Sequence, residues 1–443
     1  MSINRDILRI ALPAIVSNIT VPLLGLCDTT IAGHLGDAGF IGAIAVGTMM
    51  VNVVFWCFGF LRSGTSGMTA QAYGSGDREA SAVVFSRAFL VAMLTGLLIV
   101  ALQWPLKALV LAVIHPAADV RALASMYFSI VIWGAPAMLA TMSVSGWFLG
   151  MQSSFYPMII AVVTNVINIG LSLLCVYGFS LGFPGTAIGT LGANWCGLLL
   201  ALWLARRFNG GRMPFSSWRK TVALSGLGRF FRVNTDIFFR SFCIMGVSMG
   251  VTSIGARLGN DILALNAVMM QFFMFFSYFM DGFAFAGEAL AGKCVGRRDK
   301  GQLGRTVRAL MGWGAIMAVI FTAIYLLFYG PISSFITDSG AVLSLLDDYR
   351  LYLFLIPSLT VGAFLFDGIY IGMTATAAML WVTLAGAALF FAIDFIGWDA
   401  GGLTLSLPDN DRLWSAFLSY LLVRGAGLAM LFRRESRHAL VAA

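Results

Sequence analysis

The stretch SGWFLGM at residues 145–151 returns as DGIYIGM at residues 367–373, which is an offset of 222 residues. A second pair repeats this offset, because YGSGDRE at 73–79 matches VGRRDKG at 295–301. Self-similarity at a fixed spacing is the sequence signature of a duplicated structural unit. The chain is therefore predicted to contain two copies of one fold.

The composition indicates that lipid, not water, surrounds most of the chain. Hydrophobic residues make up 59% of the 443 residues, charged residues make up 11%, and the mean hydropathy is +0.89. An ordinary soluble domain carries about 25% charged residues. Since apolar runs of roughly 20 residues cross hydrocarbon as helices, we predict an all-α polytopic membrane protein.

Twelve apolar runs are predicted to be transmembrane helices. They cover residues 10–33, 40–70, 85–110, 122–149, 156–178, 185–205, 233–256, 262–291, 307–330, 346–372, 375–396 and 413–432. The prediction is an N-terminal six-helix lobe at 1–205, a flexible cytoplasmic linker at 206–232 and a C-terminal six-helix lobe at 233–443. Because six is even, both lobes begin on the same side of the membrane, and such pseudo-symmetric lobes are expected to surround a central cavity.

Basic residues predict the orientation of the chain. Most of the 28 Lys and Arg residues lie in the N-terminal segment, the linker, the loop at 293–308 and the C-terminal segment, which contributes Arg424, Arg433, Arg434 and Arg437. Cytoplasmic loops are rich in Lys and Arg. Both termini are therefore predicted to be cytoplasmic, in a cell inner (plasma) membrane, and the net charge of +8 does not indicate nucleic-acid binding.

Asp28 is the first ionisable residue inside a predicted span, and such residues commonly mark function. Pro22 lies six residues earlier and cannot donate to the carbonyl of Asn18, so the helix is expected to bend there and free an acceptor. We interpret Asp28 as a proton- or cation-binding carboxyl group. The alternative is a solvated side chain near the outer interface.

The fifth predicted helix carries Asn165, Asn168 and Ser172 at spacings that place them on one helix face. These side chains could hydrogen-bond an acid of the first helix or a substrate. Polar residues of this kind also hold transmembrane helices together. Both interpretations stay open.

The second half contains several intramembrane charges. Asp236 and Arg240 are four residues apart and are expected to pair within their helix, with a transport role as the alternative. Asp281 and Asp367 have no Lys or Arg within a helical turn, so they need a partner from another helix and are candidates to line the cavity. Arg62 is one possible partner, although it could also extend toward an interface.

The stretch AVMMQFFMFFSYFM at 267–280 contains Met269 and Gln271, which are further cavity candidates. Methionine and aromatic surfaces can repack around varied substrates. Such residues are also ordinary in helix cores and on lipid-facing surfaces. Arg424 and Asp394 are placed near helix ends, with structural roles.

At these residues the chain resembles the multidrug and toxic compound extrusion (MATE) family, in its DinF-type branch. The resemblance spans nearly the whole chain and is carried by LPAIVSNITVPLLGLCDTTIAGHLG (12–36), FLRSGTSGMTAQAYG (60–74), GARLGNDILALNAVMMQ (255–271), DGFAFAGEALAGKCVGRRD (281–299) and DGIYIGMTATAAM (367–379). It implies two six-helix lobes around a central cavity and export driven by inward H+ or Na+ flow.

The resemblance also implies roles for single residues. Asp28 matches the protonated acid of the first helix, Asn168 matches the Asn beside it, Thr190 matches a Thr of the sixth helix, and Asp367 looks like an acid implicated in cation binding. One position departs, because Ser172 stands where the family commonly has Asp. A two-acid Na+ site is thus less favoured than a single-acid proton site on Asp28.

These observations predict a secondary active transporter, an H+-coupled antiporter that exports small organic compounds, cationic or amphipathic, by alternating access. The alternatives are Na+ coupling, or a flippase for lipids or lipid-linked oligosaccharides. No HExxH or Walker-type sequence occurs. Two GxSxG strings do occur, GFSLG at 178–182 and GVSMG at 246–250, but they lie at the end of one predicted transmembrane helix and inside another, not at a strand-to-helix turn. No enzyme, metal site or cofactor is therefore predicted. The expected partners are small organic substrates and membrane lipids, and the expected state is a monomer.

Overall fold

A computed structural model describes residues 3–34, 38–223, 227–396 and 409–442, and the regular elements in these ranges are all helices. The first half contains α1 (Ile3–Gly33), α2 (Ala38–Trp56), η1 (Cys57–Gly59), α3 (Phe60–Ser75), α4 (Arg78–Ala101), α5 (Gln103–Ile114), α6 (Ala118–Val131), η2 (Ile132–Gly134), α7 (Ala135–Gly150), α8 (Phe155–Leu173), η3 (Leu174–Gly178) and α9 (Phe183–Phe208). The short α10 (Trp218–Thr221) lies in the linker. The second half contains α11 (Leu227–Arg257), α12 (Asn260–Gly296), α13 (Lys300–Ile336), α14 (Gly340–Met373), α15 (Thr376–Ile396) and α16 (Asp409–Ala442).

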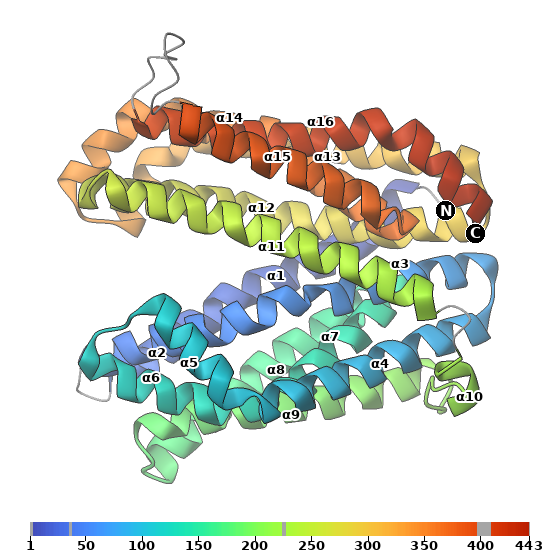
Figure 1. The fold of residues 1–443 in the computed structure, drawn as a ribbon, viewed down its shortest axis with the longest axis horizontal. Coiled ribbons are helices and arrows are strands. Elements are labelled where there is room, and N and C mark those ends of the chain that lie inside the picture. The colour runs from blue at the N-terminus through green and yellow to red at the C-terminus, as the bar shows by residue number, and fades with distance from the viewer. Residues whose placement is uncertain (1–2, 35–37, 224–226, 397–408, 443) are drawn as a thin grey trace. The chain divides into compact units, whose positions relative to one another are not determined.

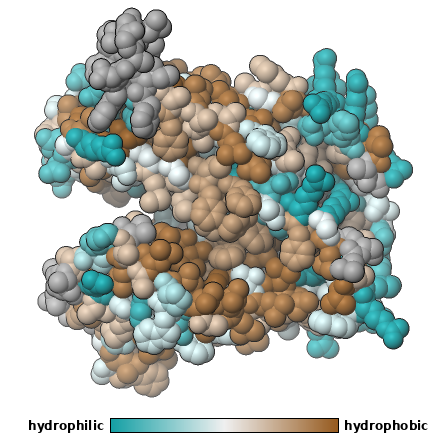
Figure 2. Space-filling model, in the orientation of Figure 1, coloured by the Kyte–Doolittle hydropathy of each residue, from teal (hydrophilic) through white to brown (hydrophobic). Residues whose placement is uncertain are grey.

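The predicted fold class is confirmed. Within the described ranges, 11 helical segments are long and apolar enough to cross a membrane. The remaining predicted span lies in α1, a helix of 31 residues that continues through Pro13 and Pro22. On the face shown in Figure 2, apolar side chains cover the middle of the helices and hydrophilic side chains gather nearer their ends.

Large apolar side chains are exposed along the spans, as lipid contact requires. Leu199, Val319 and Leu327 expose 66%, 70% and 73% of their surfaces. In water, an apolar surface of this extent would drive association. The chain is therefore a multi-pass membrane protein.

The chain forms two compact units. One covers Leu12–Asn234, and the other covers Thr235–Ala443 together with Met1–Ala11. The start of α1 therefore belongs to the second unit, where the Trp313 indole N–H donates to Asn4 Oδ1 at 3.3 Å. Within each unit the helices run roughly along a common direction (Figure 1).

The internal duplication extends to the helix caps. Asp77 caps α4 by accepting a hydrogen bond from the Ala80 amide at 2.9 Å. At the same offset of 222 residues, Asp299 caps α13 by accepting from the Gln302 amide at 2.8 Å. Left-handed backbone recurs at this offset too, at Gly76 and Arg298 and at Gln152 and Thr374.

Close helix contacts recur in the same way. Gly146 of α7 lies against the backbone carbonyl of Arg62 in α3, and Gly368 of α14 lies against the backbone carbonyl of Ala284 in α12. A side chain at either glycine would meet backbone atoms, so only glycine permits this approach. The two units thus share close helix contacts as well as helix caps at the same offset.

The linker is shorter and better fixed than expected. Helix α9 continues to Phe208, and α11 already begins at Leu227. Arg87 of α4 donates from Nε to the carbonyl of Thr221 at 2.9 Å and from Nη2 to the carbonyls of Lys220 and Ala223 at 3.1 Å each. These bonds hold 220–223 against α4, which corrects the expectation of a flexible tether for this part of the linker.

Candidate functional site

Asp28 lies in the interior of the N-terminal unit. Its surface is 8% exposed, and Oδ1 is buried without a hydrogen-bond partner in the part of the chain that the structure describes. No charged side chain among those residues interacts with it. An isolated buried carboxyl group is costly in its ionised form, so the expectation of a merely solvated side chain at the interface is not supported.

Tyr127 of α6 connects Asp28 to the neighbouring helices. It interacts with the Asp28 carboxyl group and with the side chains of Thr190 on α9 and Thr48 on α2. Its ring packs against Gly47, where a Cβ would stand 2.7 Å from the ring. Sequence reasoning missed both Tyr127 and Thr48. The available signal was a tyrosine inside an apolar span, where its hydroxyl needs a partner.

The polar face of α8 meets α9 at this place. Asn168 Nδ2 donates to Thr190 Oγ1 at 3.2 Å, and the Ser172 hydroxyl donates to Asn168 Oδ1 at 3.4 Å. Thr190 in turn donates to the carbonyl of Thr186 at 3.0 Å. The structure therefore brings Asn168, Ser172 and Thr190 together, and their role in ion coupling stays a prediction.

Asn165 serves α1 instead. Its Nδ2 donates to the carbonyl of Thr20 at 3.3 Å, two residues before Pro22. The bond ties α8 to the segment of α1 that the proline weakens, which fits the helix-joining interpretation. A bend of α1 at Pro22 stays a prediction.

In the C-terminal unit, Asp367 of α14 lies between two arginines. Its Oδ2 accepts hydrogen bonds from Nη2 of Arg240 on α11 and from Nη2 of Arg424 on α16. Arg424 also donates from Nη1 to the hydroxyl of Tyr420 at 3.2 Å and lies 5.2 Å from the centre of that ring. All three charged side chains are largely buried, with 14% exposed for Asp367, 10% for Arg240 and 7% for Arg424.

Two sequence predictions are wrong here. Arg240 does not pair with Asp236. Arg240 Nη2 donates to Asp367 Oδ2 instead, and Asp236 Oδ2 accepts a hydrogen bond from the Thr376 hydroxyl at 2.7 Å. Arg424 is not a peripheral residue, because it lies within the 34-residue α16 with 6% of its surface exposed. The cause in both cases is the same. A partner from another helix can outcompete a neighbour on the same helix when the carboxylate is buried.

Four further cavity candidates are Met269, Gln271, Asp281 and Arg62. Met269 is fully buried in the C-terminal unit, while Gln271 is exposed on the same helix. The Ser277 hydroxyl lies 3.5 Å from Asp281 Oδ2, and Arg62 Nη2 donates to the Ser63 hydroxyl at 2.9 Å. Cavity roles for these four residues stay predictions.

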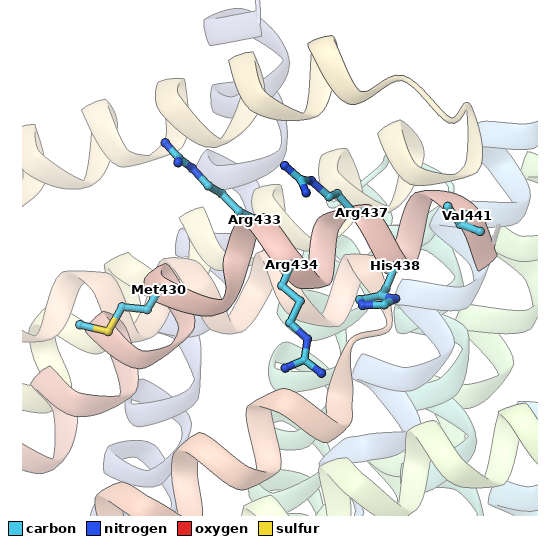
Figure 3. A pocket seen from close by; sticks show the side chains of 6 residues that line it. All are labelled: Met430, Arg433, Arg434, Arg437, His438 and Val441. Atoms are coloured by element: carbon cyan, nitrogen blue, oxygen red, sulfur yellow. The ribbon is translucent and has the colours of Figure 1, made fainter.

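A basic pocket lies at the end of α16. It has a volume of about 760 Å³ and is lined by Met430, Arg433, Arg434, Arg437, His438 and Val441. Arg433 and Arg437 point to one side of the helix, and Arg434 and His438 point to the other (Figure 3). A basic helix end is typical of a cytoplasmic membrane interface. The cytoplasmic location of the C-terminal segment stays a prediction.

The N-terminal cluster can hold one small cation or one proton. It offers a single carboxylate together with neutral oxygens from amide and hydroxyl groups. Among the described residues, no group of three or more His, Cys, Asp or Glu side chains could bind a metal ion.

Comparison with known proteins gives a consistent result. The family model MatE matches residues 13–174 and 237–396, one range in each half. DNA damage-inducible protein F of Escherichia coli (strain K12) is 36% identical over 437 residues, which cover 99% of this chain and 94% of that protein. Multidrug resistance protein MdtK of Photorhabdus laumondii is 22% identical over 451 residues, which cover 98% and 95%.

Solved structures show the same fold. The Vibrio cholerae MATE transporter VcmN in the bent form matches with a TM-score of 0.87 at 16% identity, over 99% of this chain and 98% of that chain. A MATE crystal structure in the bent conformation matches with a TM-score of 0.84 at 17% identity, over 99% and 96%. At such identities the likeness shows the fold alone.

Proposed function

The chain belongs to the MATE transporter family, not to an enzyme family, and on that premise we propose that it exports small organic compounds in exchange for protons bound at Asp28. The observation that carries the proposal is the buried Asp28 carboxyl group without a charged partner among the described residues. Burial disfavours the charged form of a carboxyl group, whereas hydrogen-bond donors favour it. A carboxyl group that alternates between these two environments takes up and releases a proton.

Tyr127 and Asn168 would supply the second environment. Both belong to the polar cluster around Thr190, and a small movement of α1 toward them gives Asp28 donors for its free oxygen. A coupling ion drives transport only if it binds one conformation better than the other. The contrast between an unpartnered and a hydrogen-bonded carboxylate provides that difference.

A Na+-coupled exporter is the second candidate. Asn168, Ser172 and Thr190 present neutral oxygen atoms close together, and hard cations prefer oxygen ligands. Ser172 supplies no second negative charge, however, so a single carboxylate would have to balance the cation. We therefore favour the proton.

We also propose an oligomeric state, a membrane and an orientation for the transporter. It would work as a monomer in a plasma membrane, with both termini in the cytoplasm, on amphipathic compounds that reach it from the cytoplasm or the inner leaflet. The basic residues of the linker and of the α16 end support this orientation.

Proteoliposomes test the proposal. Purified protein is reconstituted with ethidium or dansylglycine, a cationic and an anionic amphipathic compound, and their movement is followed by fluorescence under a pH gradient, a Na+ gradient or neither. We expect uphill movement of at least one compound under the pH gradient alone. Movement under the Na+ gradient alone, or no uphill movement of either compound, would overturn the proposal.

A further inference from the structure

The Asp367 cluster contains more positive than negative charge. Arg240 and Arg424 both bind the same carboxylate oxygen, and Asp367 is the only carboxyl group among the described residues that interacts with either guanidinium group. Arginine keeps its charge in proteins. The cluster of three side chains therefore carries a net charge of +1.

No neighbouring group in the described chain balances this charge. Tyr420 accepts a hydrogen bond from Arg424 and stacks beside it, which stabilises the cation but adds no negative charge. Asp236, one turn before Arg240, is engaged with Thr376 instead. An excess charge in a membrane-protein interior is costly, and such groups usually mark an ion or substrate site.

The arginines also keep hydrogen-bonding capacity. Nε of Arg240 and Nε of Arg424 are buried without a partner among the described residues, as is Oδ1 of Asp367, and the two guanidinium groups share the single acceptor Oδ2. A second oxyanion would give each guanidinium group its own partner. The planar guanidinium fork matches carboxylate and related oxyanions in geometry. Asp367 and Arg240 remain partly accessible, with 14% and 10% of their side chains exposed.

We propose that Arg240 and Arg424 form an anion-binding site that takes the carboxylate or sulfonate group of an exported amphipathic compound. Asp367 tunes this site, because it offsets one of the two positive charges and holds both guanidinium groups in place. The inference deepens the proposed function and rests on it, since it names the substrate class. It also means that Asp367, flanked by two arginines, is disfavoured as a site for a second cation.

Two matched probes test the charge requirement. Dansylglycine carries a carboxylate, and dansylglycine amide has the same fluorophore without the charge. Their binding to the purified full-length protein in a non-ionic detergent is measured by dansyl fluorescence. We expect the carboxylate to bind about 10-fold to 100-fold more tightly than the amide, as charge-assisted hydrogen bonds imply.

Three variants should change the affinity for the carboxylate probe in opposite directions. Asp367→Asn raises the net charge, so it should tighten carboxylate binding and leave amide binding unchanged. Arg240→Gln and Arg424→Gln each remove the excess charge, so each should abolish the difference between the probes. Arg305→Gln, at an exposed position near the start of α13, is the control and should change neither. Thermal unfolding of each variant confirms that it folds, and Arg424→Lys, which keeps the charge, should retain most of the preference if Arg424→Gln does not fold.

Equal binding of both probes by the unaltered protein, or weaker carboxylate binding in Asp367→Asn, overturns the inference. The same probes separate this failure from failure of the proposed function. If pH-driven transport carries both probes equally, the exporter stands and the anion site falls. If neither these probes nor ethidium moves, the proposed function falls, and binding in detergent still reports on the anion site.

Discussion

Replacing Gly368 with alanine tests the tightest helix contact of the C-terminal unit. A Cβ at this position would lie 2.6 Å from the carbonyl carbon of Ala284 and 2.8 Å from its Cα. Because these are backbone atoms, α12 and α14 have to separate, whereas a flexible side chain could simply move aside. Overpacking of this kind costs about 1–3 kcal/mol. For a unit of this size, a loss of about 2 kcal/mol lowers the Tm by roughly 4–8 °C.

The assay is thermal unfolding of the purified protein in detergent, followed by intrinsic fluorescence. Gly312→Ala on α13 is the matched control, because no atom lies within 4 Å of its added Cβ. That variant should keep its Tm or raise it slightly, since alanine is about 1 kcal/mol better than glycine in a helix. Gly146→Ala, the equivalent change in the other unit, should resemble Gly368→Ala. Equal Tm values for Gly368→Ala and Gly312→Ala would refute the reasoning.

Three further predictions concern the linker and the Asp28 cluster. Arg87→Ala removes three hydrogen bonds to linker carbonyls and should speed trypsin cleavage within 206–223 several-fold. Arg78→Ala, at an exposed position, is the control and should not change the cleavage rate. Equal cleavage rates for the two variants would contradict the contact of the linker with α4. Ser172→Asp adds a second carboxylate to the cluster and should make the Tm rise with Na+ concentration. The measurement is thermal unfolding in NaCl compared with KCl, and the unaltered protein should show no such difference. Tyr127→Phe removes one hydroxyl worth about 1 kcal/mol, so pH-driven export should fall about five-fold, and an unchanged export rate would remove Tyr127 from the mechanism.

The sequence predicts the fold well because the duplication is local and repeated. A cap residue such as Asp77 needs only its own helix start, and its equivalent Asp299 lies at the expected offset with the same hydrogen bond. The spacing of Asn168 and Ser172 likewise places them on one helix face, and the structure shows them in contact. Patterns within one helix are therefore readable from the sequence.

Contacts between helices are harder to read. The Asp367 carboxylate meets Arg424 from a helix 57 residues further along the chain, and no periodicity connects the two positions. The i, i+4 rule instead favoured the pairing of Arg240 with Asp236, which the structure does not show. Tyr127 was missed for the same reason, because a tyrosine in an apolar span gains meaning only when the helix that carries Asp28 lies beside it.

Proton coupling through Asp28 is tested most directly by Asp28→Asn in proteoliposomes with an imposed pH gradient. Asparagine keeps the size of the side chain but cannot exchange a proton, so uphill export should be lost while downhill exchange of the same compound continues. Asp261→Asn, at an exposed acid near the start of α12, is the control and should export normally. Undiminished uphill export by Asp28→Asn would contradict the account.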